Sequence, residues 1–419
     1  MAEQTKVKTL EKVVIRFSGD SGDGMQLTGT IFSNLSAVFG NEISTFPDYP
    51  AEVRARQGTL SGVSGFQVHL GSRKIFTPGD KADVLVAMNP AALKVNVKHL
   101  KPNAIVLIDT DSFKKSDLDK ALFTTDDPFT ELGLTGVQVV AAPISTMVKD
   151  GLVEFGLDNK SALRCKNMFA LGLVCWLFER PLEEAMHMLQ NKFAKKPVIA
   201  QANIKALTDG YNYGNNIHAS VSTYRIESKK AEPGFYTDVN GNKATSYGLI
   251  AAAEKAGLQL FLGSYPITPA TDILHELSKR KDLGVITVQA EDEIAGICTS
   301  IGASFAGCLA ATSTSGPGLA LKSEAIGLAV IAELPLVIID VQRGGPSTGL
   351  PTKSEQTDLM QALYGRNGES PAVVIAASTP TDCFDAAFWA GKLAVEHMTP
   401  VILLTDAFIA NGSSAWRIP

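Results

Sequence analysis

The sequence has few cysteines, and they do not form a recognisable framework. The five cysteines are an odd number and contain no C-x-x-C pair; they are Cys165, Cys175, Cys298, Cys308 and Cys383. This pattern argues against a disulfide scaffold and against a zinc or iron–sulfur centre built by this chain alone. The histidines are also scattered, without an H-x-x-x-H pair or a Cys/His cluster.

The sequence also lacks an excess of one charge and a long hydrophobic run. Lys and Arg number 38 against 43 Asp and Glu, which leaves a net charge of −5. No basic face for nucleic acid is therefore expected. The N-terminus has no apolar h-region, and the most apolar stretch, 328–341, is interrupted by Glu333 and Pro335. The sequence predicts a cytoplasmic protein that does not enter the membrane.

What the sequence does contain indicates a large α/β protein. Its 419 residues exceed the roughly 250–300 residues at which single cores stop growing, so we expect two domains. Hydrophobic residues make up 45%, and the 36 glycines are typical of tight turns beside ligand sites. Residues 208–240 show little apolar periodicity and are predicted as a linker between a first domain at 1–207 and a second at 241–419.

The first domain is predicted to begin a doubly wound, Rossmann-like fold. A short β-branched run, 13–17, precedes the glycine turn 19–24, and residues 25–39 carry apolar side chains at helical spacing. Later apolar runs predict buried parallel strands, followed by helices. These strands are 82–87, 104–109 and 137–142, and these helices are 161–179 and 181–193.

The second domain alternates strands and helices with a different spacing. This alternation predicts a parallel sheet covered by helices on both faces, with ligands at the carboxyl ends of the strands. The predicted strands are 258–262, 285–289, 309–312, 336–341, 372–376 and 401–404, and the predicted helices are 245–256, 270–280, 291–305 and 319–332.

The glycine turn of the first domain is open to several interpretations. Its backbone N–H groups stand between a strand and a helix, where they are placed to meet an anion. Asp20 and Asp23, however, put negative charge where the pyrophosphate of a dinucleotide such as NAD would lie. Gly22-Asp23-Gly24 also imitates the start of a magnesium–diphosphate motif, but the Asn that such a motif needs further along is missing. A structural turn is the favoured interpretation.

The second domain carries a hydroxyl and an acidic helix start after two of its predicted strands. In Tyr265-Pro-Ile-Thr-Pro269 the prolines stiffen the loop and hold the Thr268 hydroxyl at a strand end, although a turn that caps the next helix is the simpler alternative. Acids at 291–293 suit the helix dipole. Glu293 stands where this helix becomes apolar, so its carboxyl is a candidate for an apolar site, with Glu291 as the competing assignment.

Two more loops of this domain follow predicted strands. Residues 312–318, Thr-Ser-Thr-Ser-Gly-Pro-Gly, form a hydroxyl-rich turn before a helix. Residues 343–353, Arg-Gly-Gly-Pro-Ser-Thr-Gly-Leu-Pro-Thr-Lys, combine a guanidinium with hydroxyls and open backbone, which suits bidentate binding of a carboxylate. An ordinary glycine loop with a surface Arg343 is the alternative.

In their order and spacing, these motifs of the second domain resemble the α subunits of 2-oxoacid:ferredoxin oxidoreductases, most closely the 2-oxoglutarate branch. The first domain resembles the γ domain of that family, fused ahead of α, although Gly22-Asp-Gly-Met departs from the glycine–glutamine turn of separate γ subunits. The resemblance implies a γ-type Rossmann-like domain followed by a thiamine-diphosphate pyrimidine-binding domain, with a further domain after Pro419 in the full-length protein.

The resemblance also implies roles for individual residues. Glu293 matches the glutamate that hydrogen-bonds a ring nitrogen of the aminopyrimidine, because it lies nine residues before Gly302 as that glutamate does. Thr268 and Arg343 match residues that hold the carboxylate and carbonyl of the 2-oxoacid. Thr348 and Thr352 lie beside them, and the other implied cofactor contacts are Tyr265, Pro266, Ile267, Thr314, Ser315 and Gly316.

The implied activity is the oxidative decarboxylation of a 2-oxoacid, with coenzyme A as cosubstrate and ferredoxin as electron acceptor. For 2-oxoglutarate the products are succinyl-CoA and CO2. Because this chain has no cluster-binding motif, a β subunit is implied that shares thiamine diphosphate and carries Mg2+ and the iron–sulfur cluster, in an (αβ)2 heteromer.

Several alternatives to this interpretation remain open. Pyruvate or a branched or indolic 2-oxoacid is an alternative substrate, and an assembly subunit that is inert without β is an alternative function. Arg54 and Arg56 are candidates for the phosphates of coenzyme A or, equally, a solvated basic pair.

Overall fold

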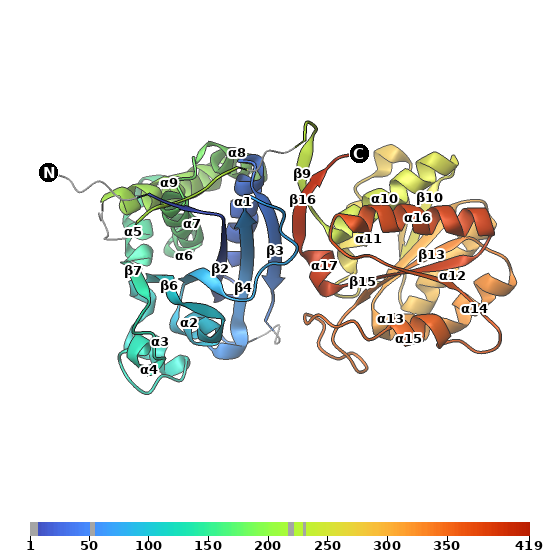
Figure 1. Ribbon diagram of the computed structural model, residues 1–419, viewed down its shortest axis with the longest axis horizontal. Coiled ribbons are helices and arrows are strands. Elements are labelled where there is room, and N and C mark those ends of the chain that lie inside the picture. Colours follow the sequence, from blue (N-terminus) through green and yellow to red (C-terminus); the bar gives the residue numbers. More distant parts are fainter. Residues whose placement is uncertain (1–6, 51–54, 217–221, 229–231) are drawn as a thin grey trace. The chain divides into compact units, whose positions relative to one another are not determined.

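The computed structural model describes residues 7–50, 55–216, 222–228 and 232–419, which form two compact units (Figure 1). Unit 1 contains the described residues up to Asp238 together with Arg417–Pro419, and unit 2 is Val239–Trp416. The region predicted as a linker from residue 208 begins inside helix α9 (Pro197–Asn216). Although α9 carries many polar residues, it packs closely on α7, since a methyl group on Gly210 would lie 2.0 Å from the Phe169 carbonyl oxygen.

Unit 1 is built on a mixed sheet in which β7, β6, β5, β2, β4 and β3 are consecutive neighbours. Strands β2, β5, β6 and β7 are parallel, as the sequence predicts, but β4 runs antiparallel to β2 and β3. Neither β3 nor β4 is predicted from the sequence, because their buried faces include polar side chains such as Thr45 and Gln67. The bounds are β2 Lys12–Asp20, β3 Glu42–Asp48, β4 Val63–Gly71, β5 Ala82–Ala87, β6 Leu100–Asp109 and β7 Gln138–Ala142.

The helices of unit 1 include one that is buried on nearly every side. Helix α7 (Lys166–Leu177) is apolar around its circumference, which is typical of a helix inside a core. The predicted helix 161–179 is divided into α6 and α7 at Arg164 and Cys165. The other helices are α1 Met25–Val38, α2 Pro90–Asn96, α3 Lys115–Lys120, α4 Pro128–Glu131, α5 Ile144–Gly151, α6 Asn159–Leu163 and α8 Glu183–Lys192.

Four short strands complete the connections of the chain. β1 (Lys8–Leu10) and β8 (Tyr224–Ile226) form a parallel pair. β9 (Tyr236–Asn240) and β16 (Ser413–Arg417) are neighbours, and each includes residues from both sides of the unit boundary.

Unit 2 has a six-stranded sheet in the order β11-β10-β12-β13-β15-β14, and every pair in it is parallel. The predicted parallel sheet is therefore confirmed, with strand bounds that differ by a few residues from those expected. The strands are β10 Leu260–Ser264, β11 Ile286–Gln289, β12 Leu309–Thr314, β13 Leu336–Gln342, β14 Val373–Ala376 and β15 Pro400–Asp406.

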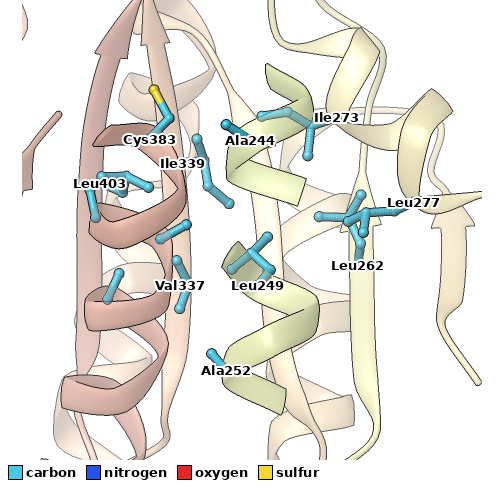
Figure 2. Close-up of a cluster of buried hydrophobic side chains, with 14 of the residues drawn as sticks. Ala244, Leu249, Ala252, Leu262, Ile273, Leu277, Val337, Ile339, Cys383 and Leu403 are labelled. Atoms are coloured by element: carbon cyan, nitrogen blue, oxygen red, sulfur yellow. The ribbon is translucent and has the colours of Figure 1, made fainter. Parts of the chain in front are cut away.

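Helices cover both faces of this sheet. On the first face, α10 (Gly241–Ala256) and α16 (Asp382–His397) pack with side chains such as Val337 and Ile339 of β13, while α11 (Thr271–Leu277) lies beside Leu262 of β10 (Figure 2). On the second face, Leu336 and Ile338 of the same strand pack with a different set of helices. That set is α12 Glu293–Phe305, α13 Gly316–Leu321, α14 Ser323–Ile331 and α15 Leu359–Tyr364, and α17 Ala407–Asn411 follows β15.

The order of the strands places a ligand crevice at a definable position in unit 2. From β10 the chain passes through α11 on the first face to β11, whereas from β12 it passes through α13 and α14 on the second face to β13. The loops that follow the neighbouring strands β10 and β12 therefore leave toward opposite faces, which is the arrangement that opens a binding crevice in parallel sheets.

None of the helices in the described parts of the chain is both long enough and apolar enough to cross a bilayer.

Candidate functional site

The predicted site residues lie on loops at the carboxyl ends of the strands of unit 2. Strands β10 and β12 are joined just before these loops, because the Ser264 hydroxyl donates to the Ser313 carbonyl oxygen at 2.7 Å. The Ala290 amide also donates to the Ser264 carbonyl oxygen, at 3.0 Å, and so connects the start of the loop before α12 to the same edge. The buried hydroxyl of Ser264 thus holds the base of the crevice together.

Glu293 is a buried carboxyl side chain at the first position of α12. The preceding Asp292 is the N-cap, and its carboxylate accepts from the Ala295 amide at 2.7 Å. Glu293 is 8% exposed, whereas Glu291 is exposed. The two candidates therefore differ in environment, and the buried position favours Glu293 for a role in an enclosed site.

The turn before α13 lies directly against the Glu293 side chain. A methyl group on Gly318 would stand 2.8 Å from Cγ of Glu293 and 1.9 Å from the Thr314 hydroxyl oxygen. The absence of a side chain at Gly318 is thus what allows these groups to approach. The structure brings Glu293 and Thr314 together around this glycine, as the predicted site requires.

Lys322 is fully buried and lies against the first residue of α12. It stands between α13 and α14, where the sequence predicts one continuous helix over 319–332. Its ammonium donates to the Glu293 carbonyl oxygen at 2.7 Å. Burial lowers the pKa of Lys322 from 10.5 to about 8, while attraction to Glu293, Asp292 and Cys298 acts in the opposite direction. The Lys322 side chain thus leaves the α13–α14 junction toward the first residue of α12.

Arg343 is also buried, and its guanidinium joins two of the predicted loops. One Nη group donates to the Thr268 carbonyl oxygen at 2.8 Å and the other to the Thr348 carbonyl oxygen at 2.9 Å. Burial lowers the pKa of Arg343, and the charge of Glu293 opposes this shift, so the two charged groups are close enough to interact. The Nε atom is buried without a hydrogen-bond partner among the described residues.

The structure places the other predicted residues on these same loops with differing exposure. Thr268 and Thr348 are exposed, and Thr352 is half-buried. Arg343 donates to the main-chain carbonyl oxygens of Thr268 and Thr348 and not to their side chains. In the loop that contains Thr268, Tyr265 is 37% exposed, Pro266 and Ile267 are half-buried, and Ile267 packs on the core of the first face.

A pair of carboxyl groups lies behind the turn that starts α13. Ser315 is buried and its hydroxyl oxygen has no partner among the described residues, while Gly316 lies against the carboxylate of Asp358. Burial and the nearby Asp358 raise the pKa of Asp340 well above its usual value. Burial also raises the pKa of Asp358, so two carboxyl groups with raised pKa values lie between β13 and the start of α15.

In unit 1 the glycine turn is closed by its own acidic side chains. The Asp23 carboxylate accepts from the Asp20 amide at 2.8 Å and pairs with Lys166 at 3.2 Å. The Asp20 carboxylate accepts from the Gly58 amide at 2.9 Å. Carboxylates thus occupy donors that a pyrophosphate would need, which supports the structural interpretation of this turn. Of the basic pair, Arg56 is exposed and Arg54 lies outside the described residues.

Lys322 and Asp340 are not predicted as site residues from the sequence. Both residues are charged positions inside apolar segments: Lys322 follows Leu-Ala-Leu at 319–321, and Asp340 follows Leu-Val-Ile-Ile at 336–339. A charged residue in a stretch predicted to be buried requires a partner, and this conflict between pattern and residue type is the signal that identifies them.

Two family models match the chain. Residues 14–213 match the model described as pyruvate ferredoxin/flavodoxin oxidoreductase. Residues 251–419 match the model described as the thiamine-diphosphate-binding domain of pyruvate flavodoxin/ferredoxin oxidoreductase. The first range falls within unit 1, and the second lies in unit 2 except for its last three residues, Arg417–Pro419.

Individual relatives agree with the family models. The chain is 54% identical over 410 residues to the 2-oxoglutarate oxidoreductase subunit KorA of Mycobacterium tuberculosis, covering 98% of this chain and 63% of that protein. It is 43% identical over 182 residues to the 2-oxoglutarate synthase subunit KorA of Archaeoglobus fulgidus, covering 43% of this chain and 51% of that protein.

A solved structure is similar over almost the whole chain. It is the 2-oxoglutarate:ferredoxin oxidoreductase from Magnetococcus marinus with 2-oxoglutarate, coenzyme A and succinyl-CoA bound. The match has a TM-score of 0.81 and 34% identity, and covers 98% of this chain and 66% of that one. The present chain thus spans about two thirds or less of the length of these relatives.

Substitution of Gly318 by Ala is expected to damage the site without unfolding unit 2. The new methyl group would press on Thr314 and Glu293 and lower the free energy of unfolding by about 1–3 kcal/mol. Gly302→Ala is the matched control, since its methyl group would meet nothing within 4 Å in the same unit. Thermal unfolding of both variants tests this, and equal Tm values would contradict the tight contact.

Lys322→Met is expected to stabilise the chain at neutral pH. Below pH 8 the folded and unfolded chains both carry the Lys322 proton, so the full cost of the buried charge is present, at most about 3 kcal/mol for the shift from 10.5 to about 8. Between pH 8 and 10.5 the folded chain loses this proton first, and the wild type becomes relatively more stable. Denaturant unfolding at pH 7 and pH 10 should therefore show a gain that shrinks with rising pH. A variant less stable than wild type at pH 7 would contradict this.

Proposed function

This chain belongs to the 2-oxoacid:ferredoxin oxidoreductase family, as its sequence motifs predict, and we propose that it provides the pyrimidine side of a thiamine diphosphate site in an enzyme that oxidatively decarboxylates 2-oxoglutarate. The observation that carries this proposal is the burial of Glu293 at the start of α12, against the Gly318 turn and within electrostatic range of two buried cations.

The buried polar atoms of unit 2 fit a bound polar cofactor. The Ser315 hydroxyl oxygen and Arg343 Nε are buried without partners among the described residues, and such atoms cost free energy unless a ligand or water satisfies them. Thiamine diphosphate, when bound, supplies a carbon nucleophile that adds to the carbonyl carbon of a 2-oxoacid. The loops with Tyr265, Pro266, Ile267, Thr268, Thr314, Ser315 and Gly316 are the proposed cradle for its pyrimidine side.

Glu293 is the proposed proton-holding group of this site. Its carboxyl is fixed at the first turn of a helix and largely removed from water, so a hydrogen bond that it makes to a ring nitrogen is not exchanged for one to solvent. A carboxyl in that position can share a proton with the ring nitrogen, which is general acid–base work. The exposed Glu291 would make the same hydrogen bond in competition with water.

Arg343 and Thr268 are the proposed contacts for the 2-oxoacid. The two Nη groups of Arg343 already hold the main chain of the Thr268 and Thr348 loops, and Nε and the second N–H of each Nη remain for a carboxylate. A bound carboxylate would thus meet a guanidinium whose plane is set by protein carbonyls. Thr352, half-buried in the loop that begins at Arg343, completes the proposed substrate contacts.

The choice of substrate rests on the relatives. Those from Mycobacterium tuberculosis and Archaeoglobus fulgidus are named for 2-oxoglutarate, and the Magnetococcus marinus structure holds 2-oxoglutarate, coenzyme A and succinyl-CoA. We therefore favour 2-oxoglutarate over pyruvate, with coenzyme A as cosubstrate, succinyl-CoA and CO2 as products, and ferredoxin as electron acceptor.

A β subunit is the proposed partner. Several large apolar side chains are exposed on α12, α14 and α15, the helices of the second face, and exposed apolar groups on one set of helices are typical of a protein interface. These side chains are Ile294, Phe305, Leu328, Ile331, Met360 and Tyr364. We assign Mg2+ and the iron–sulfur cluster to this partner, in an (αβ)2 heteromer of the cytoplasm.

Reconstitution tests the proposal directly. The chain together with its β subunit should reduce viologen with 2-oxoglutarate and coenzyme A, and each subunit alone should not. Glu293→Gln should lower turnover by roughly 10²–10⁴, the size of a general acid–base contribution, while Glu291→Gln serves as the control with near-normal turnover. A preference for pyruvate or an indolic 2-oxoacid would contradict 2-oxoglutarate as the proposed substrate. Activity of this chain alone would contradict the need for a β subunit.

Arg343→Lys should raise the KM for 2-oxoglutarate. An ammonium has no planar fork, so it cannot hold the Thr268 and Thr348 carbonyls and a carboxylate in one plane. Steady-state kinetics at saturating coenzyme A should give a KM at least about 10-fold higher, corresponding to the loss of roughly one charge-assisted hydrogen bond. The KM for coenzyme A is the internal control, and an unchanged KM for the 2-oxoacid would remove Arg343 from substrate binding.

A further inference from the structure

Lys322 is a buried lysine whose hydrogen bond to α12 is not needed to form the helices on either side of it. It stands at the junction of two short helices, α13 and α14, and it is fully buried. Its ammonium reaches across to α12 and donates to the Glu293 carbonyl oxygen at 2.7 Å. The same carbonyl belongs to the first residue of α12, so the hydrogen bond fixes the helix at the point from which the Glu293 side chain departs.

The groups that face this ammonium are mainly acidic. Glu293, Asp292 and Cys298, all on α12, interact with its charge, and the other buried cation near Glu293 is Arg343 after β13. Glu293 thus interacts with two buried cations, one at the α13–α14 junction and one after β13. The ammonium of Lys322 therefore lies within electrostatic range of the Glu293 carboxyl.

Keeping a charged lysine here is costly for folding. A fully buried ammonium loses its hydration, and one hydrogen bond to a carbonyl does not replace it. A methionine has a similar length and would fill the same space with no charge to desolvate. A costly charge next to a proposed catalytic carboxyl is the pattern expected where function, and not stability, selects the residue.

We propose that Lys322 is a positioning residue for Glu293: its ammonium holds the first turn of α12 and supplies positive charge beside the carboxyl that binds the thiamine pyrimidine ring. This inference rests on the proposed function and deepens it. The hydrogen bond from Lys322 fixes the backbone from which the carboxyl departs, so it sets the direction in which Glu293 meets a ring nitrogen. Loss of Lys322 should weaken cofactor binding as well as turnover.

The charge of Lys322 also gives the site a pH dependence. Its pKa is lowered to about 8, so the ammonium is charged at pH 7 and becomes neutral as the pH rises through 8. The neutral amine still donates to the Glu293 carbonyl but no longer provides positive charge. Thiamine diphosphate affinity should therefore fall above pH 8 in the wild type. An arginine at this position stays charged and should not show that fall.

The experiment uses the assembled enzyme with its β subunit and measures thiamine diphosphate binding by calorimetry from pH 6 to pH 9.5, together with turnover. Lys322→Met should weaken binding and lower turnover at least about 10-fold at pH 7, since it removes both tether and charge. Lys322→Gln keeps a donor without charge, and should fall between Met and wild type. Lys322→Arg should bind without the decline above pH 8. Lys255→Met, at an exposed lysine on α10, is the control for loss of one positive charge and should match wild type.

The outcomes separate a positioning role from a structural one. Weak binding by Lys322→Met with an unchanged or raised Tm supports the proposal, because a purely structural lysine would lose stability and binding together. Wild-type affinity in Lys322→Met overturns the proposal, and so does a decline above pH 8 that persists in Lys322→Arg. If Lys322→Met does not fold, Lys322→Gln and the pH profiles decide the question. If wild type binds no thiamine diphosphate, the proposed function fails first, and this inference falls with it.

Discussion

The candidate site of unit 2 depends on buried charged groups that offset the desolvation cost of one another. Glu293, Lys322 and Arg343 are all withdrawn from water at one end of a parallel sheet, where an isolated ion would be very costly. Lys322 is satisfied by the main chain of Glu293, and Arg343 by carbonyls of two loops, while Glu293 lies within the field of both cations. Each charge therefore constrains a loop or helix end, and the positions of the loops follow from the need to satisfy the charges.

The sheet beneath these charges explains why they converge. Parallel strands present their carboxyl ends at one edge, and the switch between β10 and β12 sends the next segments to opposite faces. The Ser264 bond to β12 holds the two strand ends together below the crevice. The residues of the site are far apart in sequence because each belongs to a different strand–helix connection, and the sheet supplies their common location.

The architecture of unit 2 was largely predictable from sequence because its strands are short apolar runs that end in polar loops. The same reasoning failed for β3 and β4 of unit 1, where buried polar side chains such as Thr45 and Gln67 interrupt the apolar pattern. It also missed Lys322, since the apolar pattern predicts one helix over 319–332 and the contact of its ammonium with the Glu293 carbonyl oxygen is visible only in the structure. The loops with Glu293, Thr268 and Arg343 were identified by motif, but the contacts of Arg343 with main-chain carbonyls required coordinates.

Gly318 shows how the dimensions of such a site can be set by an atom that is absent. With no β-carbon at this position, α13 approaches α12 closely enough for the hydroxyl of Thr314 and the chain of Glu293 to share one small volume. Any other amino acid would act as a spacer between the two helices, and every group carried by α13, including Lys322 at its far end, would move away from the carboxyl. The site can therefore vary in sequence at its rim, but the width between its two central helices is fixed by a glycine.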